Sequence, residues 1–162
     1  MGERIELNES DRALATWVGA ERFAYGSKHC QDKAKGNIDK KQMSIDGALA
    51  EMAFAKHSGL YWPPTVRGKE DRPDVPPFEV RGTRNIVGGN LLIKPDDRRG
   101  LYVLVLIHTD WFEVVGYSTV TTEPMPVGHP WENNQKEMNW RIMRHELREF
   151  DVRKMRQWMA QQ

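Results

Sequence analysis

The sequence lacks the features that mark several classes of protein. Its one cysteine, Cys30, can form no disulfide within the chain, and no cysteines and histidines are spaced as in a structural zinc site. No apolar run reaches the length of about 18 residues that a membrane span needs, and the N-terminal MGERIELNES has no signal-peptide core. We therefore expect a cytoplasmic protein with no membrane partner.

An excess of one charge is also absent. The chain has 24 basic and 23 acidic residues, so its net charge gives no indication of a nucleic-acid partner. Basic residues gather in the segments 28–41, 81–99 and 141–156, where acidic residues interrupt them. Such segments could contact phosphates, but a solvated surface of mixed charge is the more frequent outcome.

Length and helical periodicity indicate one domain with three helices. A chain of 162 residues suits a single core, because two separate cores would each be small. The first helix is predicted over residues 8–25, with a packing stripe of Leu14, Trp17, Val18 and Tyr25. After a loop at 31–37, apolar residues recur every three or four positions over 40–57, and Gly59 suits the end of that helix. The third helix is expected to begin at the cap Asp151.

The middle of the chain predicts a sheet. Strands are predicted at residues 78–83, 91–94, 101–107 and 112–118. The uninterrupted apolar run at 101–107 is typical of a central strand that is covered on both faces. We expect a meandering sheet, an extended loop at 60–77 and irregular structure through most of a C-terminal extension at 119–162. The expected fold class is α/β (α+β), with a mixed central sheet of about four to five strands flanked by helices.

Glu51 is the only charged residue in the helical window GALAEMAFA. A carboxylate that is removed from water costs several kcal/mol unless a cation or an arginine compensates its charge. The window therefore predicts either a bound cation or an ion pair with an arginine of a neighbouring strand, unless Glu51 faces solvent.

Glu79 and Arg81 alternate with Phe78 and Val80 in FEVRGT, so they project from the other face of the strand. Asp74 precedes Glu79 by five residues. Two carboxylates and a strand carbonyl, that of Val80, would form an oxygen site suited to magnesium, which can acidify a bound water for hydrolysis of a phosphodiester. Taken alone, Asp74 also fits a turn residue in a proline-rich loop.

In this order, GALAEMAFAKHSGL, the loop with Asp74, FEVRGT and LLIKPDDRRGLYVLVLIHTDWFEVVGY resemble the core of the PD-(D/E)XK nuclease superfamily, especially its small phage-type members. The resemblance covers about residues 44–118. It implies a restriction-endonuclease-like core that hydrolyses DNA with Mg²⁺ or Mn²⁺. It also implies that Asp74 and Glu79 hold the metal and that Glu51 completes the site. A phage-encoded protein of this kind would act in the host cytoplasm.

One position departs from the family pattern, because Arg81 occupies the place of the motif lysine. Arginine can hold a phosphate but cannot readily act as a base. Lys94 could replace that lysine if its strand pairs with residues 78–83, whereas Lys56 lies about 140° round the helix from Glu51. Arg81 could instead pair with an acid in a site that has lost activity.

The expected partner is DNA, and the resemblance also permits a homodimer. Contacts with DNA are predicted for Arg84, Lys94, Arg98 and Arg99, with Trp62 or Trp111 stacking on bases. Two alternatives stay open: a silent DNA-binding or assembly module of the same fold, and a domain that binds other molecules and uses these acids only in ion pairs.

Overall fold

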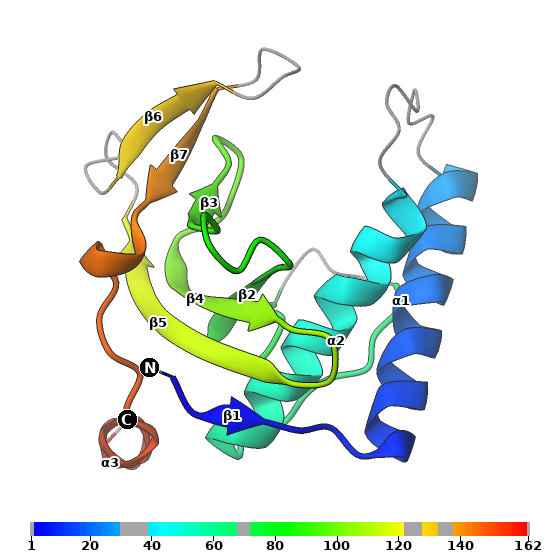
Figure 1. Cartoon of the computed structure of the whole chain (residues 1–162), viewed down its shortest axis with the longest axis horizontal. Helices are drawn as coiled ribbons and strands as arrows, with labels where there is room; N and C mark the ends of the chain where they lie inside the picture. Colours follow the sequence, from blue (N-terminus) through cyan, green and yellow to red (C-terminus); the bar gives the residue numbers. More distant parts are fainter. Residues whose placement is uncertain (1, 30–38, 68–71, 122–127, 133–137, 162) are drawn as a thin grey trace.

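The computed structural model describes residues 2–29, 39–67, 72–121, 128–132 and 138–161, so the predicted loop at 31–37 lies outside the described residues. The helices are α1 (Glu9–His29), α2 (Lys40–Ser58) and α3 (Val152–Met159), with a short 3₁₀ helix at Arg144–Glu146. The strands are β1 (Arg4–Ile5), β2 (Phe78–Thr83), β3 (Leu91–Ile93), β4 (Gly100–Ile107), β5 (Phe112–Val120), β6 (His129–Glu132) and β7 (Met138–Ile142). The α+β fold class, with a central sheet flanked by helices, is confirmed (Figure 1).

The helices α1 and α2 form a hairpin whose ends follow from local chemistry (Figure 1). The Asp39 side chain caps α2 by accepting a hydrogen bond from Gln42 N, and α2 ends at Gly59, where φ is 74°. At the helix contact, a Cβ on Gly19 would lie 2.5 Å from Ile45 Cα, so glycine permits the close approach. None of the described helices is both long and apolar enough to cross a bilayer.

The packing stripe predicted for the first helix is partly wrong. Val18 is fully buried, but Leu14 is 42% exposed and Trp17 is 56% exposed. Instead, α1 turns the small residues Ala15 and Gly19 towards the protein interior. Small side chains let the two helix backbones approach closely, and such a contact leaves no pattern of large apolar residues in the sequence.

The main sheet has the order β1-β5-β4-β2. β4 pairs in parallel with β2 and antiparallel with β5, and its residues from Tyr102 to Ile107 are all buried. The prediction that this apolar run is a covered central strand is therefore confirmed. The described parts of the loop before β2 contain no helix or strand, apart from an isolated bridge between Val75 and Phe78.

The predicted meander is wrong because β3 leaves the main sheet. It pairs with β7, and β7 pairs with β6, in a second sheet of order β3-β7-β6. The irregular structure expected between residues 119 and 150 is wrong for these two strands, whose short length and mixed polarity gave no clear alternation. Since β3 does not pair with β2, the condition that would have brought Lys94 beside Glu79 is not met.

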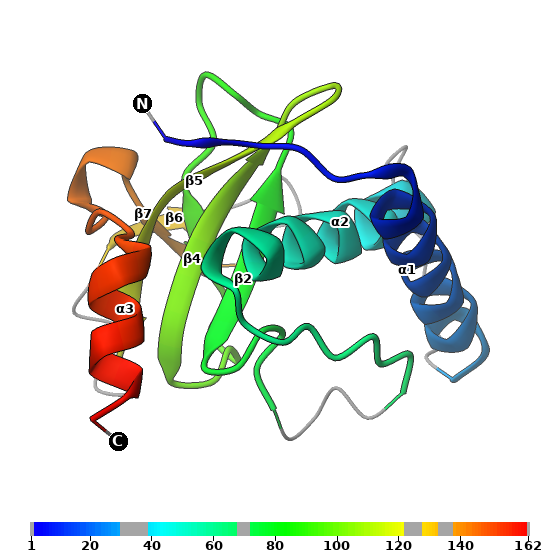
Figure 2. The same ribbon diagram turned by 90° about the horizontal axis from the view of Figure 1, so that it is seen from below.

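The two faces of the main sheet carry different layers. Phe78, Val80 and Val103 share a core with α2, and α3 adds Met155 to this core. Tyr102, Leu104 and Val120 share a smaller core with Leu91, Ile93 and Ile142 of the second sheet. Figure 2 shows α2 crossing β2 and β4, with β6 and β7 beyond the sheet. A residue of β2 therefore faces either α2 or the second-sheet side, according to its parity.

Candidate functional site

Strand geometry places Glu79 and Arg81 on the face of β2 that points away from α2. Their neighbours Phe78 and Val80 belong to the α2 core, and successive side chains of a strand point to opposite faces. In the parallel pairing with β4, Glu79 stands opposite Tyr102. The site is therefore built on the side of the sheet that also carries the second, smaller core.

Asp74 reaches the same place through a tight turn. Val75 and Phe78 exchange two backbone hydrogen bonds of 2.9 and 2.7 Å, which fold the loop back on the start of β2. Asp74 Oδ2 then accepts a hydrogen bond of 3.0 Å from Val80 N. β2 is an edge strand, so this N–H has no strand partner on its outer side. Val80, predicted as a source of a carbonyl ligand, thus contributes its N–H to the position of Asp74.

The turn at residues 94–99 adds two charges of opposite sign. Asp97 Oδ1 accepts a hydrogen bond of 2.9 Å from Arg81 NH2, and Arg98 Nε lies 2.9 Å from Glu79 Oε1. The turn is fixed by Asp97, which also accepts from Lys94 N, and by the Tyr102 hydroxyl, which donates to Arg98 O. Of two adjacent residues in this turn, Asp97 therefore pairs with Arg81 and Arg98 pairs with Glu79.

These residues line a hollow of about 300 Å³. Its lining consists of Arg72, Asp74, Glu79, Arg81, Asp96, Asp97, Arg98 and Tyr102. Arg81 lies over the Tyr102 ring at 5.1 Å from the ring centre, and its NH1 is 3.9 Å from Asp74 Oδ2. The hollow thus combines an acidic wall with guanidinium groups that can hold an anion such as a phosphate.

The two central carboxylates compete for compensation. Asp74 is 6% exposed and Glu79 is 7% exposed. Burial, and then the neighbouring Asp74 carboxylate, raise the pKa of Glu79 to about 7, although Arg98 and Arg81 oppose this shift. Among the described residues, none donates a hydrogen bond to Glu79 Oε1, because Arg98 is close to it without the required alignment. The pair therefore favours uptake of a proton or of another cation.

The residues present fit a magnesium-like cation through two carboxylates. Within the described part of the chain, no group of three or more histidine, cysteine, aspartate or glutamate residues could hold a metal ion. Magnesium in phosphate-processing sites commonly uses one or two carboxylates, with waters and substrate phosphates as its other ligands. Asp74 and Glu79 could supply such a pair, with no third acidic side chain.

Arg81 differs from a lysine in its proton affinity. Burial acts to lower the pKa of Arg81, but Asp97 and Asp74 together raise it above its ordinary value. The side chain is therefore a permanent cation that is held by Asp97, and it cannot accept a proton from water.

Glu51 lies outside this hollow, on the helix that covers the opposite face of β2. Both of its carboxylate oxygens accept hydrogen bonds of 2.8 Å from Arg22 NH1, and Trp62 Nε1 donates to Oε2 at 2.9 Å. Arg22 also donates to Thr65 O. Of the alternatives that burial predicted, the structure shows the arginine, but it comes from α1 rather than from a neighbouring strand.

The predicted DNA contacts lie in different surroundings. Arg84 makes two short contacts, 2.6 and 2.7 Å, with Asp46, whereas Lys94 and Arg99 are exposed and do not line the hollow. Lys56 pairs with Asp11. Among the tryptophans named above, Trp62 is buried and Trp111 stacks on His108 at 3.5 Å between ring centres.

Four residues of the hollow were not identified as site residues from the sequence: Arg72, Asp96, Asp97 and Tyr102. Asp97 and Arg98 carry charges complementary to Arg81 and Glu79, so the adjacent acid and base in KPDDRRG were a usable signal. Tyr102 gave no such signal, because its position opposite Glu79 depends on the register between β2 and β4.

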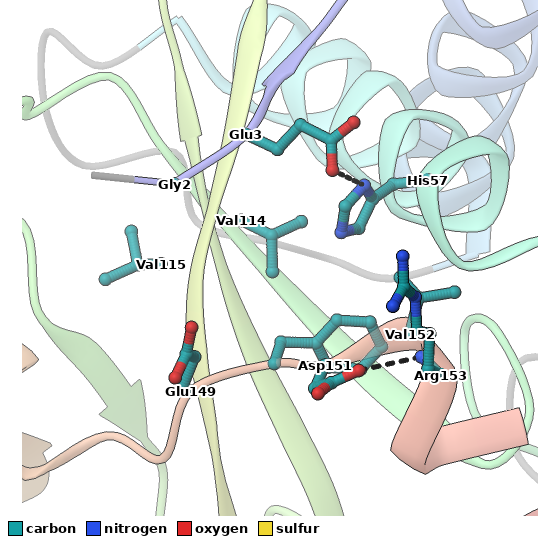
Figure 3. A pocket seen from close by; sticks show the side chains of 10 residues that line it. Gly2, Glu3, His57, Val114, Val115, Glu149, Asp151, Val152 and Arg153 are labelled. Carbon is teal, nitrogen blue, oxygen red and sulfur yellow. Dashed lines mark hydrogen bonds and ion pairs between the residues drawn. The ribbon is translucent and has the colours of Figure 1, made fainter. Parts of the chain in front are cut away.

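A larger hollow of about 540 Å³ lies between the N-terminal segment, β5 and the start of α3 (Figure 3). His57 Nδ1 is 3.7 Å from Glu3 there, and burial lowers the pKa of His57 while Glu3 partly raises it. Asp151 caps α3 by accepting from Arg153 N and Lys154 N. Glu3 and Asp151 are thus engaged with separate partners, whereas Asp74 and Glu79 act on each other, which makes the Asp74–Glu79 hollow the stronger candidate.

No family model matches the chain, and neither a curated protein nor a solved structure is significantly similar to it.

Proposed function

We propose that the chain is a metal-dependent nuclease that hydrolyses phosphodiester bonds in DNA, with Mg²⁺ or Mn²⁺ held by Asp74 and Glu79. The observation that carries the proposal is the contact between these two buried carboxylates in a hollow that is also lined by arginines. Carboxylates placed together in this way create a demand for a cation, and the guanidinium groups suit the anionic substrate.

The chain's own residues have separable tasks in this proposal. Asp74, fixed by Val80 N, and Glu79, fixed by β2, would bind the metal. The metal would offset charge that develops on the phosphate during hydrolysis. Arg81, oriented by Asp97, would bind a non-bridging phosphate oxygen. Arg72 and Arg98 at the hollow, with Lys94 and Arg99 on the exposed turn, would contact the DNA backbone.

A cleavage assay tests this function. Purified protein is incubated with supercoiled and linear DNA in the presence of magnesium, manganese or a chelator, alongside Asp74→Asn and Glu79→Gln. Glu6→Gln is the matched control, since Glu6 is an exposed acid far from the hollow. Cleavage that needs metal and is lost only in the two site variants supports the nuclease. Equal cleavage by all four proteins would identify a contaminant and refute the assignment.

A silent DNA-binding module of the same chemistry is the second candidate. The ion pairs Arg81–Asp97 and Arg98–Glu79 favour it, because they already compensate two of the acids without a metal. Binding to DNA in chelator, measured by fluorescence anisotropy, combined with no cleavage in any metal, would support this candidate over the nuclease. If neither DNA nor Mn²⁺ binds, these acids serve only in ion pairs.

A further inference from the structure

We infer that Arg98 is a built-in competitor of the divalent cation: it occupies Glu79 in the metal-free protein and transfers to a phosphate of the nucleic acid when metal binds. This inference rests on the proposed function, since it concerns the same hollow. It assigns to Arg98 the coupling between metal and substrate, a task that differs from the fixed position of Arg81.

The contact between Arg98 and Glu79 is close but poorly directed. Arg98 Nε lies 2.9 Å from Glu79 Oε1, yet that oxygen accepts no hydrogen bond from the part of the chain that the structure describes. The Glu79 side chain is 9% exposed, so the oxygen is largely withdrawn from water while it lacks a directed donor. An interaction that is mainly Coulombic can be replaced by another cation without the loss of an aligned hydrogen bond.

Arg81 and Arg98 are held in different ways. The Arg81 guanidinium has a hydrogen bond of 2.9 Å to Asp97, lies over the Tyr102 ring and is 3.9 Å from Asp74. Arg98 is anchored through its backbone, where its carbonyl accepts from the Tyr102 hydroxyl at 2.8 Å. The Arg98 guanidinium lies against Glu79, whereas that of Arg81 lies against Asp97.

Like charges make the occupancy of Glu79 competitive. A divalent cation and the Arg98 guanidinium would both bind the Glu79 carboxylate. Because both are positively charged, each weakens the binding of the other to Glu79. Arg98 lines the hollow, so a phosphate bound there is the anion within its reach. Metal binding would release Arg98 to the phosphate, and phosphate binding would in turn favour the metal, because coupling between two ligands is reciprocal.

Calorimetric titration with Mn²⁺ tests the inference on the full-length chain. Arg98→Gln is expected to bind Mn²⁺ about tenfold more tightly than the wild type, because one neighbouring positive charge is removed. Arg153→Gln is the control: it removes an exposed arginine of α3 that does not line the hollow, and its affinity should stay within about twofold of the wild type. Glu79→Gln should lose the binding. Arg98→Met, which keeps an aliphatic stem, should show the same gain and replaces the glutamine variant if that variant misfolds.

A second titration measures the coupling. Wild-type protein should bind a short DNA duplex more tightly in Ca²⁺, used as a divalent ion that slows cleavage, than in chelator, and Arg98→Gln should lose most of this difference. Mn²⁺ binding by Arg98→Gln alone would also support the inference. If the wild type and Arg98→Gln bind Mn²⁺ equally well, the inference is refuted while the metal site stands. If no protein binds Mn²⁺, both the inference and the proposed metal-dependent function fail.

Discussion

Glu51 and Glu79 are buried to a similar extent, at 3% and 7% exposure, but they lie in opposite electrostatic surroundings. Glu51 meets the Arg22 guanidinium with both oxygens and the Trp62 indole N–H with one of them. Glu79 meets a second carboxylate, that of Asp74, and an arginine that is not aligned with it. Burial alone therefore does not distinguish the two acids, whereas the type of partner does.

The difference follows from where each partner originates. Arg22 joins α1 to α2 and, through Thr65 O, to the loop after α2, so its pair with Glu51 connects three segments of the chain. Asp74 and Glu79 lie within one short turn and strand, which brings like charges together. The first arrangement compensates a buried charge and links three segments, whereas the second leaves two neighbouring carboxylates with incomplete compensation of their charge.

The largest effect is expected from Glu51→Gln. This change leaves Arg22 buried without its counter-charge, and removing one partner of a buried ion pair typically lowers the free energy of unfolding by about 3–5 kcal/mol. Urea unfolding followed by circular dichroism measures it. The double variant Arg22→Met with Glu51→Leu is the control and should regain most of the loss. A wild-type midpoint for Glu51→Gln would show that the pair is not structural.

Glu79→Gln should change the free energy of unfolding in the opposite direction when it is measured in chelator. The pKa of Glu79 is about 7 in the folded protein against an ordinary value of 4.5. Between these two pH values, the folded state therefore holds a proton that the unfolded chain has lost. The contribution of Glu79 to the free energy of unfolding is fully present below the unfolded pKa. It should be lost, by up to about 3 kcal/mol, as the pH rises through the folded pKa. Glutamine mimics the protonated form and escapes this loss.

Unfolding of both proteins at about pH 5 and about pH 8 measures this difference, and comparing them removes the contribution of other titrating groups. We expect Glu79→Gln to gain stability relative to the wild type at the higher pH, and Mn²⁺ to stabilise only the wild type. A relative loss at the higher pH would mean that Glu79 is as well compensated as Glu51, and the contrast would disappear.

Asp74→Ala should have an intermediate effect. The Val80 N–H loses its buried acceptor, which typically costs about 1–2 kcal/mol. Asp74→Asn keeps an oxygen for that N–H and serves as the control, with a midpoint nearer to that of the wild type. Thermal unfolding in chelator separates the two variants, and equal midpoints would show that the contact with Val80 contributes nothing.

Arg84→Gln should have the smallest effect, below about 1 kcal/mol, because its pair with Asp46 has a half-exposed arginine side chain. The same urea series measures it, and Asp46→Asn should match it. If Arg84→Gln lowers the free energy of unfolding as much as Glu51→Gln does, surface and buried ion pairs contribute equally to the stability of this fold.

Much of the fold was readable because local signals were strong. Gly59 and Asp151 mark helix ends, and the apolar run from Leu101 to Ile107 marks the central strand. The second sheet was not readable, because β3, β6 and β7 are short and their pairing depends on residues distant along the chain. A period of two is hard to detect over strands of three to five residues.

The site was predictable to the extent that it is local. Glu79 and Arg81 share a face through strand alternation, and Asp74 is near them in the sequence. The partner of Glu51 was not predictable, because Arg22 precedes it by 29 residues and lies on another helix. The contacts of Asp97 and Arg98 were predictable in part, because their charges are complementary to those of Arg81 and Glu79.

The central strand β4 has a consequence for how the molecule opens. Val103 and Val105 belong to one core, while Tyr102 and Leu104 belong to the other. Separation of either layer from the sheet exposes one face of β4. We therefore expect the backbone amides of the segments around both cores to exchange their hydrogens in one cooperative opening. Because Glu79 stands opposite Tyr102, we expect opening of this sheet to expose the Glu79 carboxylate as well.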